Sequence, residues 1–250
     1  LKGTQSSLYG SNAIGGEEIF QEGLRIPIIK FMEKNVPNQA VWDLIALNVR
    51  TPDEVLGDLQ AQIASCKSGE RGMVELFQRY GADTILTYGK KLQRYAEEIT
   101  RAEIREFPNG KYRFTDHIDG VGENPEPLIL QAAIIIDDDS IVVDWTGTSD
   151  QVPAGINPSF PFTKAATYAA LRSVMESDIP NCHGFTIPIE VIAPFGSLVN
   201  PRFPAPCGAR GITGYRIIDC LFGALAEALP DRVTADTAGI DDGVRLSTQH

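Results

Sequence analysis

The chain has 250 residues, of which 43% are hydrophobic and 22% are charged, a balance typical of a globular protein with a buried core. Its formal net charge of −11 argues against nonspecific nucleic-acid binding and against docking on an anionic membrane surface. No apolar run approaches the length of a transmembrane helix, and four cysteines without CxxC or zinc-ligand spacing fit a reduced, cytoplasmic interior.

The first 38 residues carry little periodic pattern. Within them, residues 24–32 are mostly apolar, and we expect an extended segment that ends at a turn over residues 35–38. Residues 39–48 then place apolar side chains at spacings of three and four, which predicts a helix.

A second helix is expected to begin at Thr51, because a proline follows it and Glu54 can complete a capping box with Thr51. Gly81 suits its C-terminal cap, while the glycines at 69 and 72 weaken the helix or mark a break. We expect a buried stripe formed by Leu56, Leu59, Ile63, Cys66, Met73, Leu76, Phe77 and Tyr80.

A third helix follows, with Asp83 as its candidate cap. Its apolar stripe has the alternating three and four spacing of a coiled-coil seam: Ile85, Tyr88, Leu92, Tyr95, Ile99 and Ala102. Because the break between the two helices is tight, we expect them to fold back as an antiparallel hairpin. This hairpin either packs within the fold or forms an arm that contacts another subunit, and we favour the arm.

The character of the sequence changes to β from residue 110. Residues 111–118 alternate with period two, and residues 128–136 and 140–145 flank an Asp137-Asp138-Asp139 turn, which predicts an antiparallel hairpin. The later elements are expected to be a buried helix at 163–175, a short strand at 187–192 and a long apolar helix at 212–229.

Helical and β stretches are segregated in the first half of the chain and mixed later, which predicts an α+β fold instead of a regular βαβ repeat. We expect an irregular N-terminal segment plus a helical hairpin over residues 1–109. Residues 110–250 should form an antiparallel β-hairpin region and a mixed α/β segment packed on the long apolar helix.

Glu22 and Arg25 are the first candidate site residues. In a glycine-containing segment they could form a buried ion pair that only fixes the segment in place, which we favour. Alternatively, Glu22 lies beside a bound polar ring and Arg25 binds an anion or carboxylate bidentately.

A second candidate site lies at Arg210 and Gly211, just before the long apolar helix. Backbone N–H groups at a helix start can bind an anion, and glycine permits its close approach. The same sequence could equally be a tight packing loop at a subunit interface. Cys207, close by, has no identifiable His or Asp partner that would make it a nucleophile.

The remaining chemistry-bearing residues are weaker candidates. On a strand, His117 and Asp119 could share one face but Asp116 could not, and two ligands are too few for a metal site. The hydroxyl-rich residues 144–149 and the nearby Asn157 could bind a ligand or close turns. There is no Walker lysine loop, so this chain offers no sequence basis for binding ATP itself.

Several blocks together resemble the B-subunit family of ATP-dependent hydantoinases and 5-oxoprolinases. They occur in order at residues 21–27 (QEGLRIP), 48–59 (NVRTPDEVLGDL), 142–149 (VVDWTGTS), 208–214 (GARGITG) and 222–233 (FGALAEALPDRV). Each block alone would be a weak signal, but their order over most of the chain is specific.

The resemblance implies a division of labour within a complex. An A-type subunit would hold ATP with Mg²⁺ and phosphorylate the oxygen of a hydantoin, 5-oxoproline or other lactam. The B-type subunit would then support hydrolytic opening of the activated ring. The expected partners are therefore the A-type subunit, the remaining parts of the B-type subunit, and a small cyclic amide, in a hetero-oligomer without nucleic acid or membrane.

The resemblance also leaves alternatives open. Some relatives carboxylate ketones with ATP and bicarbonate, and a non-catalytic scaffold subunit is a third possibility. The family's metal-binding motif lies upstream of a loop whose downstream side matches residues 10–12, so we expect the divalent metal's ligands outside this chain. We therefore interpret the chain as a middle piece of a larger B-subunit domain, without assigned catalytic residues.

Overall fold

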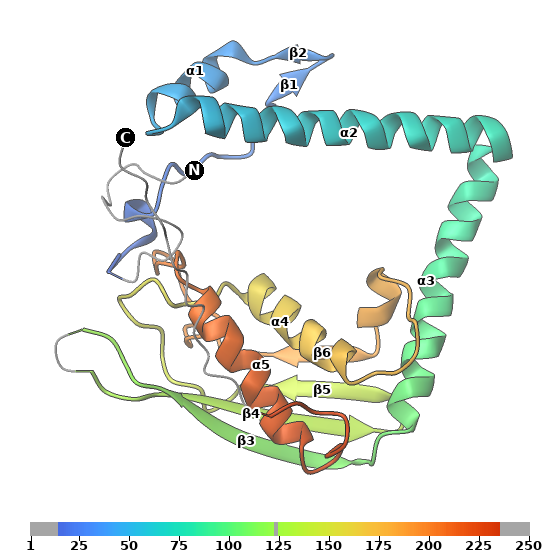
Figure 1. The fold of residues 1–250 in the computed structure, drawn as a ribbon, viewed down its shortest axis with the longest axis vertical. Coiled ribbons are helices and arrows are strands. Elements are labelled where there is room, and N and C mark those ends of the chain that lie inside the picture. Colours follow the sequence, from blue (N-terminus) through green and yellow to red (C-terminus); the bar gives the residue numbers. More distant parts are fainter. Residues whose placement is uncertain (1–14, 123–124, 236–250) are drawn as a thin grey trace, which may run out of the picture.

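A four-stranded sheet lies at one end of the structure, a computed structural model that describes residues 15–122 and 125–235 (Figure 1). Residues 10–12, which carry part of the family resemblance, and His250 lie outside the described residues. The strand order is β3-β4-β5-β6, antiparallel except for the parallel β5–β6 pair. The strands are β3 (Gly110–Ile118), β4 (Leu128–Asp137), β5 (Ser140–Asp144) and β6 (Ile189–Ile192).

The β4–β5 hairpin confirms the turn predicted at the three aspartates. Asp137 pairs with Ser140, and Asp138 adopts the left-handed φ of 49° that a tight turn requires. Asp and Asn tolerate this conformation better than most residues. The turn therefore forms where the sequence places aspartate, a residue that accepts the left-handed conformation.

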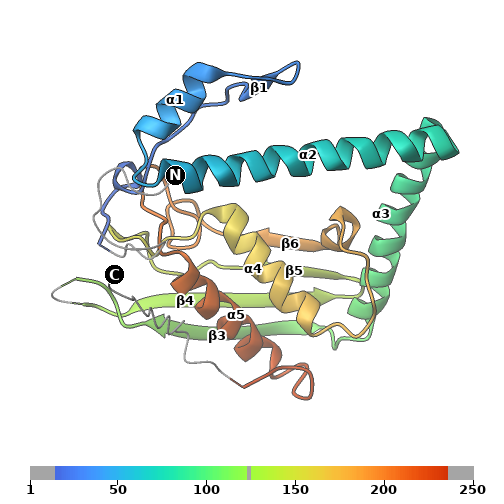
Figure 2. The same cartoon turned by 45° about the horizontal axis from the view of Figure 1, so that its top comes forward.

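Two helices, α4 (Phe160–Ser173) and α5 (Gly211–Leu225), cover one face of the sheet (Figures 1 and 2). The core between the layers contains Leu130 and Ile134 of β4 and Ile217 and Leu221 of α5, all fully buried. Burying each such side chain contributes about 1.5–3 kcal/mol. The expected long helix at 212–229 is shorter than predicted, since the regular helix ends at Leu225 and a turn follows.

The N-terminal part forms a small separate layer. A hairpin of β1 (Met32–Glu33) and β2 (Val36–Pro37) is followed by α1 (Gln39–Leu47), and the Phe31 and Trp42 rings stack at 4.7 Å. Figures 1 and 2 show this layer along the first half of the next helix, α2.

The two long helices, α2 (Pro52–Tyr80) and α3 (Ala82–Arg105), meet at Gly81, whose φ is 84°. They diverge from this corner instead of folding back, so the expected antiparallel hairpin is wrong (Figures 1 and 2). The reason is that α3 packs on the body of the fold: a Cβ at Gly184 would come within 2.0 Å of the Gln93 carbonyl oxygen of α3. No helix in the described part of the chain is long and apolar enough to cross a membrane.

Several local expectations for these helices also fail. The helix α2 runs without a break through its two internal glycines, and the Thr51 side chain makes no capping hydrogen bond among the described residues. Gly81, not Asp83, occupies the cap position before α3.

The predicted buried stripes on the two helices differ from the observed burial. Within α2, all of which the structure describes, no residue is buried, because only the small N-terminal layer lies along this helix and it covers the first half incompletely. In α3 the buried residues are Ala96, Thr100 and Ile104, a strip at spacings of four on the side that packs against residues 183–186 and β5. Tyr88, Leu92 and Tyr95 of the predicted stripe are exposed.

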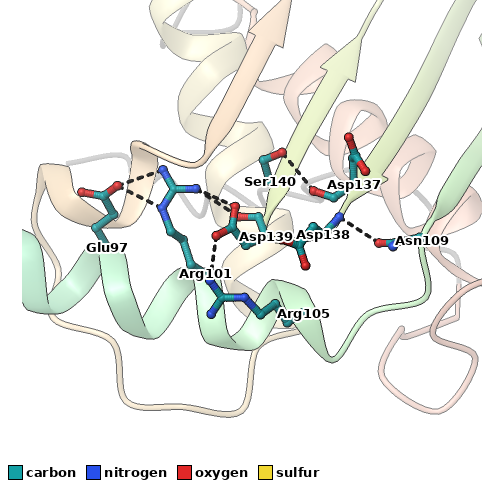
Figure 3. Close-up of polar contacts among 8 residues, drawn as sticks. All are labelled: Glu97, Arg101, Arg105, Asn109, Asp137, Asp138, Asp139 and Ser140. Atoms are coloured by element: carbon teal, nitrogen blue, oxygen red, sulfur yellow. Dashed lines mark hydrogen bonds and ion pairs between the residues drawn. The ribbon is translucent and has the colours of Figure 1, made fainter.

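A group of charged side chains fixes α3 to the sheet (Figure 3). Arg101 Nη1 lies 2.8 Å from Asp139 Oδ1 at the β4–β5 turn, and Arg105 Nη2 lies 2.7 Å from Asp139 Oδ2. Glu97 accepts two further hydrogen bonds from Arg101 and holds its guanidinium in place. One carboxylate therefore binds two successive turns of α3, which sets the direction of that helix.

Candidate functional site

Glu22 follows the short 3-10 helix η1 (Ile19–Gln21). A contact with a distant segment of the same chain holds that helix in place. The Ile19 N–H donates to the Pro204 carbonyl oxygen at 2.8 Å, which places η1 against the loop before α5. From there Glu22 Oε1 accepts a hydrogen bond of 2.5 Å from the Gly208 N–H. The structure therefore joins two segments that the sequence presented as separate candidates.

Gly208 is a glycine for a steric reason. A Cβ at this position would lie 2.9 Å from Glu22 Oε1, closer than side-chain atoms normally approach. Glycine thus lets the carboxylate reach the backbone N–H directly.

Arg25 does not pair with Glu22, although the structure describes both residues, so the expected ion pair is wrong. The Arg25 guanidinium instead lies over two aromatic rings, 5.2 Å from the Phe20 centroid and 4.6 Å from the Phe203 centroid. These rings meet edge to face at 5.5 Å. Two cation–π contacts thus take the place of the expected ion pair with Glu22. The contact with Phe203 attaches the N-terminal segment to the 203–208 loop.

Arg210 occupies the turn that opens α5, and its side chain is exposed. Its guanidinium lies 5.3 Å from the Phe162 centroid and donates a hydrogen bond of 3.3 Å to the Cys207 carbonyl oxygen. Gly211 begins the helix, and a Cβ there would meet no atom of the described residues within 4 Å. A side chain at position 211 would therefore point into open space, next to the exposed Arg210.

The Cys207 thiol interacts with two charged side chains, Glu22 and Arg210. Burial raises the pKa of the Cys207 thiol, the Glu22 carboxylate raises it further, and Arg210 only partly offsets them. The thiol therefore stays protonated at neutral pH, which argues against a nucleophilic role.

Asn157, for which the sequence left ligand binding and turn closure open, holds a loop of this region together. Its side chain is buried, and its amide donates to the carbonyl oxygens of Val152, Ala154 and Pro206 at 2.8–2.9 Å. It also accepts a hydrogen bond from the Val152 N–H. Asn157 thereby positions the loop that presents Gly208, a role for which an Asn-Pro dipeptide gives no distinctive signal.

Comparison with known proteins gives the family of this chain. The model of the hydantoinase B/oxoprolinase family matches residues 5–248. This chain belongs to the hydantoinase B/oxoprolinase family.

Two curated relatives illustrate the family. The B chain of a putative D-/L-hydantoinase from Pseudomonas sp. (strain NS671) is 34% identical over 247 residues, covering 94% of this chain and 42% of the relative. The beta chain of the caprolactamase from Pseudomonas jessenii is 31% identical over 223 residues, covering 88% of this chain and 38% of the relative. The chain thus spans about two fifths of the length of these relatives.

Two solved structures share the fold. The ATP-dependent caprolactamase from Pseudomonas jessenii superposes with a TM-score of 0.84 at 30% identity, over 90% of this chain and 39% of that chain. A nucleotide-free acetone carboxylase also gives a TM-score of 0.84, at 17% identity over 94% of this chain and 34% of that chain. The second likeness concerns the fold alone.

Two other candidate residues of this hydantoinase B-type chain, Asp144 and Asp116, make contacts within the fold. Asp144 Oδ1 accepts hydrogen bonds from the Thr146 N–H at 2.9 Å and the Thr146 hydroxyl at 2.6 Å, which closes a turn. Asp116 pairs with Arg216 of α5 at 2.5 Å, while His117 is exposed beside it.

A divalent metal, which the family resemblance implies, finds no matching ligand set here. Over residues 15–122 and 125–235, no group of three or more His, Cys, Asp and Glu side chains is placed to hold an ion. We therefore derive no step through a metal bound to this part of the chain.

Proposed function

We propose that this chain is part of the B-type subunit of an ATP-dependent cyclic-amide hydrolase. In this proposal an A-type subunit holds ATP with Mg²⁺ and transfers the γ-phosphoryl group to the oxygen of the ring amide. The chain described here shapes the place where the activated ring is opened. Support comes from the family, whose members are hydantoinases and oxoprolinases acting on cyclic amides.

One observation carries the proposal for the site. The Glu22–Gly208 hydrogen bond brings the 21–27 and 208–214 blocks together beside the exposed Arg210, at the start of α5. The Arg210 guanidinium suits an anion such as the phosphoryl group or carboxylate of an activated substrate. The N–H groups of Arg210 and Ile212 already donate to backbone carbonyl oxygens, so the guanidinium carries this role. Glu22 positions the loop, and Arg210 and Gly211 face the anion.

The chemistry that this site would support follows from the activated amide. O-phosphorylation withdraws electrons from the amide carbon, so water adds to it more readily. Collapse of the tetrahedral adduct breaks the C–N bond, the ring nitrogen leaves with a proton, and a second water releases phosphate. A cation near the phosphoryl oxygens stabilises the charge that builds during addition.

The experiment is ATP turnover by the assembly that contains this chain, first with a panel of cyclic amides and then with ketones plus bicarbonate. Stimulation by a cyclic amide without bicarbonate supports the proposal, and strict bicarbonate dependence would assign the chain to a ketone carboxylase. Arg210→Gln should lower the stimulated rate by at least about tenfold, as expected for loss of one charge-assisted contact. The exposed Arg113→Gln serves as the matched control.

Stimulation by neither panel would favour a scaffold role. If Arg210→Gln left an established turnover unchanged, the proposed role of Arg210 at the site would be wrong.

A further inference from the structure

The carboxylate of Glu22 has one oxygen held in place and the other free. Glu22 Oε1 accepts the hydrogen bond of 2.5 Å from the Gly208 N–H. Within the part of the chain that the structure describes, Oε2 has no hydrogen-bond or ion-pair partner, yet it is not buried, so water can reach it. One oxygen therefore fixes the orientation of the carboxylate and leaves the other available for chemistry.

Neither nearby arginine forms an ion pair with this carboxylate. The Arg25 guanidinium, three positions along the chain, lies over two aromatic rings. The Arg210 guanidinium lies over a third ring and donates to a backbone carbonyl oxygen. A cation bound to a carboxylate stabilises its charged form and makes it a poorer proton acceptor. Because both guanidiniums are directed elsewhere, Oε2 remains free to accept a proton.

Glu22 and Arg210 nevertheless lie close to one point in the fold. The Glu22 carboxylate raises the pKa of the Cys207 thiol, and the Arg210 guanidinium lowers it. Since the effect of a single charge falls with distance, both charged groups lie near this thiol. The site thus holds a free carboxylate oxygen beside a cation. Attack of water on a phosphorylated amide needs this combination, in which the cation binds the phosphoryl oxygens and the carboxylate binds the water.

We propose that Glu22 is the general base of the ring-opening step. The proposal rests on the function proposed above, in which the ring amide arrives O-phosphorylated. Glu22 Oε2 removes one proton from a water molecule as the water oxygen bonds to the amide carbon, and the C=N π pair moves to the ring nitrogen. The carboxyl group then gives this proton to that nitrogen.

A second proton transfer through Glu22 completes the step. The proton of the new hydroxyl group passes through the carboxylate to the ring nitrogen as the C–N bond breaks and the carbonyl group forms. The products are an amine and an acyl phosphate, and the Glu22 carboxylate is regenerated. A second water then releases phosphate, as in the function proposed above.

Glutamine at position 22 separates the proton transfer from the positioning of the loop. A Gln side-chain oxygen still accepts a hydrogen bond from the Gly208 N–H, but a neutral amide does not take a proton from water. Glu22→Ala removes both abilities. If Glu22 only holds the loop, Glu22→Gln should retain activity and Glu22→Ala should lose it. If Glu22 is the general base, both variants should lose ring opening.

The test is a rapid-quench measurement on the full assembly, with ATP and a cyclic amide that stimulates turnover. It measures the first-turnover ADP and the ring-opened product separately. We expect Glu22→Gln to form ADP at the parent rate while its rate of ring opening falls at least about 100-fold. Glu22→Ala should lose at least as much. Glu17→Gln makes the same chemical change at an exposed carboxylate of the same segment and should match the parent protein.

The possible results distinguish this inference from the proposed function. Urea unfolding midpoints of Glu22→Gln close to those of the parent would show that the variant is folded. Ring opening by Glu22→Gln at the parent rate would overturn the general-base assignment and leave the proposed function intact. Loss of the ADP burst in Glu22→Gln would also overturn it, because Glu22 would then act before phosphoryl transfer. If no cyclic amide stimulates ADP formation by the parent assembly, the proposed function fails and this inference fails with it.

Discussion

The Gly208 N–H donates a hydrogen bond to the Glu22 carboxylate, although 186 positions separate the two residues. The contact lies where η1 meets the loop before α5, and a Cβ on residue 208 would sit 2.9 Å from the accepting oxygen. A small change at this glycine therefore displaces an acidic side chain from the candidate site.

Gly208→Ala should uncouple the two segments. We expect the free energy of unfolding to fall by about 1–2 kcal/mol, since one charge-assisted hydrogen bond is lost. The kcat/KM of the assembly should fall by at least about tenfold if the loop must be held for substrate binding. Gly57→Ala on exposed α2, where a Cβ meets no described atom within 4 Å, is the control for kcat/KM and should not lower stability, because alanine favours a helix interior. Unchanged kcat/KM in Gly208→Ala would contradict the positioning role.

Asp139→Asn should loosen α3 from the sheet. The substitution weakens two ion pairs, to Arg101 and Arg105, that are only partly buried, so we expect a loss of about 1–2 kcal/mol in urea unfolding. Hydrogen exchange should become faster in the last turns of α3. Asp137→Asn, two residues earlier on the same turn, should leave both measurements close to the parent values. Slow exchange retained in Asp139→Asn would show that apolar packing alone holds the helix.

Acid should weaken the structure partly through Glu103. Burial alone would raise the pKa of Glu103, but hydrogen bonds from Ser177 and from the Glu176 backbone, with help from Arg232, outweigh it and lower the pKa below its usual value near 4.5. A carboxyl group with a lowered folded-state pKa stabilises the fold above its unfolded pKa and loses this contribution as pH falls through the folded value.

Glu103→Gln should therefore be less stable than the parent near pH 7, with a difference that shrinks as the pH drops below about 4.5. Urea midpoints over a pH series measure this convergence. Glu176→Gln, whose side chain is 74% exposed, is the control and should show little difference at any pH. A difference that stays constant with pH would mean that packing, not ionisation, is responsible.

The cysteines should react with iodoacetamide in a fixed order. Cys66 is exposed and should be labelled first, and Cys207 should follow slowly because burial and the Glu22 carboxylate raise its pKa. Cys220 is buried, and burial raises its pKa to about 12, so labelling should require unfolding. Peptide mass mapping over time measures the order. Labelling of Cys207 as fast as Cys66 would reveal an activated thiolate and restore the nucleophile hypothesis.

Local patterns predicted the sheet well. Period-two alternation identified β3, and the acidic turn identified the β4–β5 hairpin, because strand pairing and turn formation here depend on neighbouring residues. The corner at Gly81 could not be predicted in the same way. An apolar stripe shows that one face of a helix is suited to packing, but it does not show which element packs there. The direction of α3 depends on Asp139, 38 positions after Arg101.

The candidate site was predicted only in parts. Glu22, Arg210 and Gly211 were each singled out, but local spacing suggested Arg25 as the partner of Glu22. The structure instead pairs each with a distant residue, Gly208 and Phe203 respectively. Contacts between residues so far apart leave no periodic signal in one sequence. Whether these residues bind substrate stays a prediction.

Because α2 is long, a small rotation at the Gly81 corner would move its far end by a large distance. A helix of 29 residues is about 43 Å long, so a rotation of about 10° at this glycine would carry the far end through about 7 Å. The N-terminal layer lies toward that end, and the chain returns from it to the body, where Ile19 donates to Pro204. Any swing of α2 must therefore be absorbed by the short link between Glu22 and Phe31, which couples the position of α2 mechanically to the segment that carries Glu22.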